Sequence, residues 1–117
     1  MSCVIGVDLG TTSCKSIVFD INGDILGESY NEYPLMILSD RVIEQDPNDW
    51  WMISKKAIFE AVQKSGIDKS RIKALSISSQ GISFVPVDLN CVPLSNAISW
   101  LDTRAEEQVN QIFIDIN

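Results

Sequence analysis

The sequence has 117 residues, of which 45% are hydrophobic and 21% charged, a balance that argues against a disordered chain and favours one packed domain. Its formal net charge of −7 argues against nucleic-acid and membrane-surface partners, since both select a basic face. There is no histidine, and Cys3, Cys14 and Cys91 lack metal-ligand spacing, so a Cys–His zinc site is excluded. No signal peptide or stretch of about 20 apolar residues is present, and a cytoplasmic protein with reduced cysteines is expected.

The first 33 residues predict three antiparallel strands. Residues 3–8 (CVIGVD) and 14–20 (CKSIVFD) are short, β-branched apolar runs typical of buried strands. Asn22-Gly23 is the strongest two-residue hairpin signal in the chain. Residues 25–33 alternate in polarity, which indicates a third strand nearer the sheet edge. We therefore expect a three-stranded meander with two tight turns.

A helix is predicted over residues 47–65, after a connection over residues 34–46 that begins at Pro34. Asp46 is the expected N-cap and Gly66 the expected terminator. Trp50 and Trp51 in the first turn are expected to pack rather than to bind a ligand. The face predicted to be buried carries Trp51, Ile58, Ala61 and Val62.

Residues 72–78 predict a fourth strand, parallel to its neighbour if the helix is a crossover connection. Residues 82–87 predict a fifth strand, and residues 96–100 a short extended segment. A last helix is predicted from Asp102, with Asp102 as a candidate N-cap. This order predicts an α/β layer with a mixed sheet, unlike the doubly wound nucleotide fold, which begins β-α-β.

The segment DLGTTSCK (8–15), between the first two strands, combines an acid, a glycine, three hydroxyls and a lysine. Backbone N–H groups around Gly10 and the three hydroxyls can form an anion nest, to which Lys15 adds a positive charge. Asp8 would repel a bare phosphate, whereas magnesium bridges one carboxylate and substrate phosphates. An ordinary Gly-Thr hairpin with an acid at a strand end fits the spacing equally well.

Four segments, in order along the chain, resemble a known family. Residues 4–26 (VIGVDLGTTSCKSIVFDINGDIL) resemble the first phosphate segment of the actin-like ATPase superfamily. The segments EQDPNDWW, IKALSISSQGISFVPVD and NAISWLDTRAEEQ resemble the FGGY carbohydrate kinases. The resemblance covers nearly the whole chain and implies a ribonuclease-H-like, actin-like ATPase lobe, with a mixed sheet that opens with the meander.

The resemblance implies ATP-dependent phosphorylation of a sugar or polyol hydroxyl. It assigns Asp8 to Mg²⁺, and it assigns the ATP phosphates to Gly10, Thr11, Thr12, Ser13 and Lys15. It assigns the substrate to Gln80, Trp100, Asp102 and Arg104. Glu44 is expected to lie nearer the ligand than Trp50 and Trp51.

No residue here matches the family's catalytic base or adenosine pocket. We therefore expect residues 1–117 to be an N-terminal part of the first lobe, inactive alone, whose cut edges favour self-association.

The substrate is left open by one departure from the family pattern. Gly81-Ile82 stand where glycerol kinases carry Arg-Glu and xylulose kinases carry Met-His. Glycerol is therefore disfavoured, and a pentulose such as xylulose is the expected substrate. Two alternatives are a non-catalytic phosphate- or partner-binding module and another actin-like ATPase, against which the segment WLDTRAEE argues.

Overall fold

The computed structural model describes residues 2–116, which divide into two compact units. The first unit contains residues 2–34 and 48–80, and the second contains residues 35–47 and 81–116. None of the described helices is both long and apolar enough to cross a membrane.

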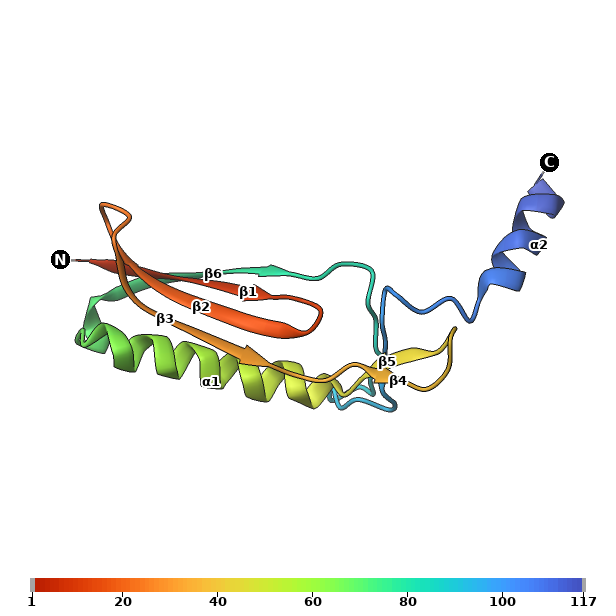
Figure 1. Ribbon diagram of the computed structural model, residues 1–117, viewed down its shortest axis with the longest axis horizontal. Coiled ribbons are helices and arrows are strands. Elements are labelled where there is room, and N and C mark those ends of the chain that lie inside the picture. The colour runs from red at the N-terminus through yellow and green to blue at the C-terminus, as the bar shows by residue number, and fades with distance from the viewer. Residues whose placement is uncertain (1, 117) are drawn as a thin grey trace. The chain divides into compact units, whose positions relative to one another are not determined.

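The first unit is a four-stranded sheet of order β3-β2-β1-β6 (Figure 1). Its strands are β1 (Cys3–Leu9), β2 (Ser13–Asp20), β3 (Ile25–Glu32) and β6 (Ile72–Ser79). The pairs β1–β2 and β2–β3 are antiparallel, whereas β1–β6 is parallel. The structure thus confirms the predicted meander, the edge position of its third strand and the parallel fourth strand.

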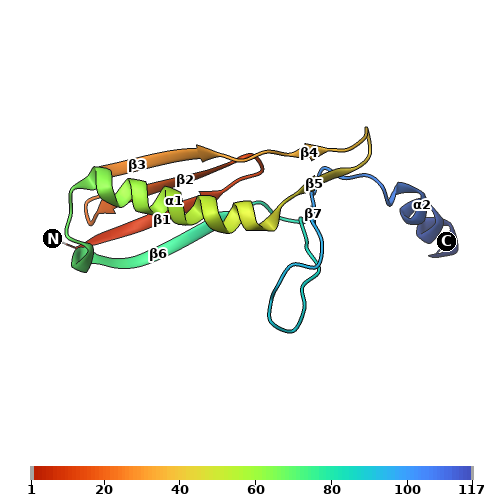
Figure 2. The same ribbon diagram turned by 90° about the horizontal axis from the view of Figure 1, so that it is seen from below.

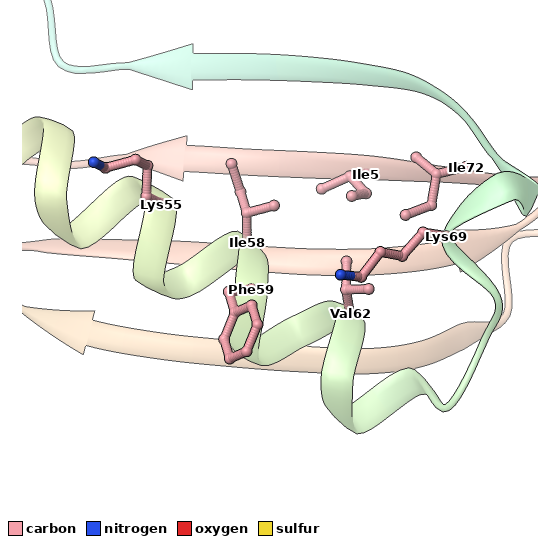
Figure 3. Close-up of a pocket in the computed structure, with 7 residues that line it drawn as sticks. All are labelled: Ile5, Lys55, Ile58, Phe59, Val62, Lys69 and Ile72. Atoms are coloured by element: carbon pink, nitrogen blue, oxygen red, sulfur yellow. The ribbon is translucent and has the colours of Figure 1, made fainter.

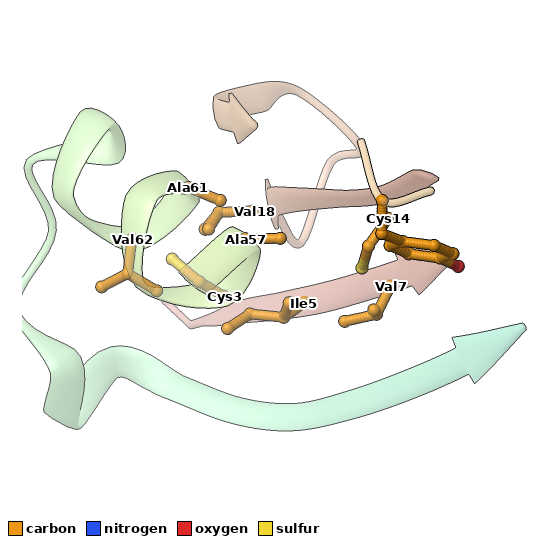
Figure 4. Packing of buried hydrophobic residues seen from close by; sticks show 9 residues of the cluster. Cys3, Ile5, Val7, Cys14, Val18, Ala57, Ala61 and Val62 are labelled. Atoms are coloured by element: carbon orange, nitrogen blue, oxygen red, sulfur yellow. The ribbon is translucent and has the colours of Figure 1, made fainter. Parts of the chain in front are cut away.

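Helix α1 (Pro47–Ser65) lies along one face of this sheet, and a short 3₁₀ helix, η1 (Lys69–Arg71), precedes β6 (Figures 1 and 2). Figure 4 shows the side chains of Ala57, Ala61 and Val62 directed toward those of β1 and β2. The buried cluster between helix and sheet consists of Cys3, Ile5, Val7, Cys14, Val18, Tyr33, Ala57, Ala61 and Val62.

The predicted helix bounds are confirmed, and Gly66, with φ of +63°, follows the last helical residue as expected. The predicted buried face is wrong at Trp51, which is 66% exposed, while Trp50 packs partly against the core. The buried stripe passes through Ala57 and Ala61, about two and three helical turns after Trp50, and a 3.6-residue period places Trp51 off that stripe. The N-cap role of Asp46 stays a prediction.

The hairpin between β2 and β3 is confirmed, but its loop is one residue longer than the Asn-Gly signal predicts. The backbone N–H of Asp20 donates to Asp24 at 3.0 Å, so three residues form the loop, and Gly23 alone adopts a positive φ, of +90°. The Asp20 carboxylate accepts the N–H groups of Asn22 and Asp24 at 2.8 and 3.0 Å, which stabilises the longer loop.

The second unit contains a three-stranded antiparallel sheet of order β4-β5-β7. Its elements are β4 (Met36–Ile37), β5 (Ile43–Gln45), β7 (Ala97–Ile98) and helix α2 (Glu106–Ile116). The connection predicted over residues 34–46 contains two short strands, β4 and β5, which the sequence pattern does not predict. Strands of two or three residues carry no periodicity, and partners distant in sequence define them.

Two predictions for this unit are wrong. Residues 82–87 form no strand, only isolated bridges from Phe84 to Ile98 and from Val87 to Pro93. Ile82 has φ of +64°, which leaves the β region at the start of that segment. The last helix begins at Glu106, so Asp102 is not its N-cap, and none of the described residues of α2 is buried. The Asp102 carboxylate has other partners, described below.

Candidate functional site

The β1–β2 hairpin places Asp8 and Lys15 opposite each other. They are register partners on adjacent strands, and with Gly6 and Ile17 they line a shallow hollow of about 190 Å³. The Lys15 Nζ atom lies 3.2 Å from a carboxylate oxygen of Glu28, and both side chains are about half-exposed. An ion pair this exposed is weak, so a phosphate group could compete for the lysine.

The turn itself is held by its own backbone and by a residue outside it. The N–H of Gly10 donates to the carbonyl of Ser13 at 2.9 Å. The hydroxyl of Tyr33 donates to the carbonyl of Gly10, and the N–H of Tyr33 donates to the carbonyl of Thr12 at 2.9 Å. The Gly10 N–H is thus engaged inside the turn. Phosphate binding by Thr11, Thr12 and Ser13 stays a prediction.

Asp8 suits a magnesium site in which the protein supplies a single carboxylate. Among residues 2–116 no group of three or more His, Cys, Asp or Glu side chains could hold a metal ion. A protein cage for a metal is therefore absent from the described part of the chain. Magnesium that binds one carboxylate, several waters and the substrate phosphates needs no such cage, and Asp8 beside the turn suits this arrangement.

Gln80 lies beside the same turn in the first unit. Its backbone N–H donates to the carbonyl of Leu9 at 2.8 Å, which continues the parallel pairing of β6 with β1 past the strand end. The parallel strands thus bring a residue predicted for the substrate next to residues predicted for phosphate.

In the second unit, Arg104 lies in a cluster with Asp102, another predicted substrate residue, and with Glu44. Its Nη2 atom lies 2.8 Å from Glu44 Oε1 and 2.8 Å from Asp102 Oδ2, and its Nε atom donates to both Asp102 oxygens at 2.9 and 3.0 Å. Asn96 Nδ2 donates to the second oxygen of Glu44 at 2.9 Å. Glu44 was expected near the ligand from the sequence. Its hydrogen bond with Arg104 joins β5 to the segment after β7.

The Arg104 cluster is ionised at neutral pH. Hydrogen bonds from Arg104 hold the pKa of Asp102 well below its usual range, and they outweigh the opposing effect of burial. Hydrogen bonds from Arg104 and Asn96 lower the pKa of Glu44 in the same way. The hydrogen bonds to both carboxylates raise the pKa of Arg104 further, so it remains a cation.

The geometry favours an indirect role for Asp102. Its side chain is 2% exposed, and its carboxylate accepts the N–H of Ile43 at 2.7 Å and the N–H of Arg104 at 3.0 Å besides the guanidinium. These bonds use about all the acceptor sites of one carboxylate. Trp100, in contrast, is 50% exposed and can offer an aromatic face. Direct substrate binding by any of these residues stays a prediction.

A larger apolar groove of about 330 Å³ lies between α1 and β6 in the first unit (Figure 3). Ile5, Ile58, Phe59, Val62 and Ile72 line it together with Lys55 and Lys69. None of these side chains belongs to a predicted site. The lining offers hydrophobic contact without convergent polar groups, so it suits packing rather than phosphate chemistry.

Comparison with known proteins identifies the family. The model of the N-terminal domain of the FGGY family of carbohydrate kinases matches residues 3–117. The chain belongs to this family. It is 38% identical over 109 residues to a xylulose kinase of Staphylococcus epidermidis and 32% identical over 109 residues to a glycerol kinase of Thermococcus onnurineus. Each alignment covers 93% of this chain and 22% of the relative.

Solved structures confirm the fold. The FGGY chain superimposes with a TM-score of 0.89 and 32% identity on a ligand-bound xylulose kinase from Lactobacillus acidophilus, over 98% of this chain and 23% of that one. A gluconate kinase from the same organism gives the same score and identity, over 97% and 23%. The predicted actin-like ATPase fold is confirmed. The chain spans less than a quarter of the length of these relatives.

Proposed function

We propose that the chain is the N-terminal part of a longer carbohydrate kinase, which transfers the γ-phosphoryl group of ATP to a hydroxyl of a sugar or polyol. The observation that carries this proposal is the pairing of Asp8 with Lys15 across the β1–β2 hairpin, in a chain of the FGGY family. A carboxylate and an ammonium group beside a hydroxyl-rich turn suit phosphoryl transfer, which depends on positioning and charge neutralisation. The proposed location is the cytoplasm.

On the phosphate side, Asp8 would help to hold Mg²⁺, which would supply positive charge to neutralise the ATP phosphates. Thr11, Thr12 and Ser13 would donate hydrogen bonds to phosphate oxygens. Lys15 would exchange its exposed partner Glu28 for the transferred group. The catalytic base and the adenosine pocket would lie outside these 117 residues.

On the sugar side, we propose a pentulose such as xylulose as the substrate. The 38% identity to a xylulose kinase supports this choice, whereas the gluconate and glycerol kinases among the relatives show how widely the family's substrates vary. Gln80 and Trp100 would contact the substrate directly. Asp102 would hold Arg104 and Glu44 in place, in keeping with its four donors.

The two alternatives are not favoured. A non-catalytic binding module and another actin-like ATPase both leave the match to the FGGY family over residues 3–117 unexplained.

The direct test is ADP release by the full-length protein with Mg²⁺, ATP and a panel of pentuloses, hexoses, gluconate and polyols. Asp8→Asn should lower kcat about 10- to 100-fold, a range typical of residues that orient metal ligands. Asp24→Asn, which changes an exposed acid between β2 and β3, is the matched control and should leave kcat unchanged. Absence of sugar-dependent ADP release from the wild-type protein would contradict the proposed function. A normal kcat in Asp8→Asn at saturating Mg²⁺ would remove Asp8 from the metal site.

A further inference from the structure

Tyr33, directly after β3, holds the phosphate turn at two points. Its hydroxyl donates to the carbonyl of Gly10, and its backbone N–H donates to the carbonyl of Thr12 at 2.9 Å. Its side chain is part of the buried cluster, with 5% of the residue exposed. One residue distant in sequence thus fixes two of the three carbonyls between Gly10 and Thr12.

These two hydrogen bonds also set the direction of two backbone N–H groups of the turn. The C=O and N–H of one trans peptide unit point in opposite directions. The carbonyl of Gly10 shares its peptide unit with the N–H of Thr11, and the carbonyl of Thr12 shares its unit with the N–H of Ser13. When both carbonyls point at Tyr33, the N–H groups of Thr11 and Ser13 point away from it.

We propose that Tyr33 is a positioning residue of the phosphate turn: it holds the carbonyls of Gly10 and Thr12 inward, so that a nucleotide phosphate meets N–H dipoles. A peptide flip at Gly10 would present a carbonyl oxygen to the phosphate, and the two negative groups would repel each other. The effect on ATP rests on the proposed function, whereas the effect on the turn does not.

The chemistry of the tyrosine suits a permanent donor. Burial raises the pKa of Tyr33 to about 12, and the nearby Cys14 and Asp8 act in the same direction. The hydroxyl therefore keeps its proton throughout the physiological pH range. Phenylalanine in its place would keep the buried ring and lose only the donor, so packing and positioning can be separated experimentally.

The test compares Tyr33→Phe with Tyr30→Phe in the full-length protein. Tyr30 lies on β3, three residues before Tyr33, but it is 59% exposed, and its hydroxyl contacts Glu32 at 3.3 Å. Loss of one hydrogen bond predicts a three- to tenfold increase in the KM for ATP in Tyr33→Phe, at about tenfold per 1.4 kcal/mol. The KM for the sugar should stay within about twofold, and Tyr30→Phe should change neither constant.

Amide exchange of the peptide spanning residues 9–14, followed by mass spectrometry, tests the turn without relying on activity. Exchange should become faster in Tyr33→Phe and stay unchanged in Tyr30→Phe. Incorporation of 4-aminophenylalanine in place of Tyr33 restores an N–H donor and should recover slow exchange and the ATP KM.

Unchanged exchange in Tyr33→Phe would overturn the proposal. So would an equal rise of both KM values with a lower melting temperature, because that pattern indicates general loosening of the fold. If the wild-type protein shows no sugar-dependent ADP release, the proposed function fails, and the exchange data still decide whether Tyr33 holds the turn.

Discussion

At the scale of single residues, the buried carboxylate of Asp102 holds neighbouring side chains of the second unit in place. The carboxylate holds Arg104, which in turn pairs with Glu44 on β5. Asp102 and Arg104 stand two apart in sequence, but Glu44 is 60 residues away from Arg104, so this cluster ties the start of the unit to its end. Loss of the Asp102 carboxylate should therefore lower the stability of this unit directly, and any effect on substrate binding should follow from that loss.

Asp102→Asn in the full-length protein should lower the free energy of unfolding of this unit by about 1–3 kcal/mol at neutral pH, because the donors of Arg104 lose a charged acceptor. The folded-state pKa of Asp102 lies below its unfolded value of about 4, so its stabilising effect is complete above that pH. It is lost as the pH falls toward the folded-state pKa. The difference in melting temperature between wild type and variant should thus be constant from about pH 8 to 5 and shrink below about pH 4.

Asp40→Asn, which changes an exposed acid of the same unit, is the control for this series. A difference that persists unchanged at pH 3 would contradict the assigned charge state. A sugar KM that rises while the melting temperature stays constant would instead show that Asp102 contacts the substrate directly.

At the scale of elements, α1 approaches β3 unusually closely, and small residues make this possible. Ala57 and Ala61 are fully buried, and Gly27 on β3 lies against the backbone of Ala61 and Ser65. The Ser29 hydroxyl donates to the carbonyl of Ala57 at 2.6 Å, and Asn31 Nδ2 donates to Glu60 Oε2 at 2.8 Å. Helix and strand are thus joined by polar contacts as well as by burial.

Gly27→Ala should be strongly destabilising. A Cβ at this position would lie 2.5 Å from the carbonyl oxygen of Ala61 and 2.5 Å from the backbone N of Ser65, and neither backbone atom can move unless α1 moves. Overpacking of this kind costs about 1–3 kcal/mol. Thermal unfolding should show the loss, whereas Gly6→Ala, whose Cβ would lie at an ordinary 3.5 Å from Phe19, is the control. Equal melting temperatures for the two variants would mean that α1 is less closely packed than described.

At the scale of the whole molecule, the chain spans 22% of the length of its curated relatives, and several of its apolar side chains are exposed. On β6, Leu75 and Ile77 are 45% and 61% exposed. On α2, Phe113 and Ile114 are 64% and 70% exposed. Exposed groups of this kind mark surfaces that another part of a protein or another molecule covers.

The 117-residue chain alone should therefore release no ADP above background when sugar is added. General-base catalysis contributes about 10²- to 10⁴-fold, and the base is proposed to lie outside these 117 residues. Its exposed apolar side chains should also cause self-association, which light scattering after gel filtration would detect. Sugar-dependent ADP release by the chain alone would show that the catalytic groups are misplaced, and a monomer at high concentration would contradict the expected association.

The sequence by itself determined the main elements of the first unit. Local signals were sufficient there, because β1 and β2 are apolar runs, β3 and α1 show the periodicity of a strand and a helix, and Gly10, Gly23 and Gly66 mark turns between them. The residue types of the segment DLGTTSCK are compatible both with an anion nest and with an ordinary hairpin, so the phosphate role of the turn stays a prediction.

Only the tertiary structure decided which residues support the site. The strands β4, β5 and β7 have two or three residues each, so their pairing depends on contacts between distant segments rather than on local pattern. The same holds for Asp102, whose donors include Ile43, and for Tyr33, whose hydroxyl contacts Gly10. Such hydrogen bonds join residues 23 to 59 positions apart, and no local periodicity encodes them.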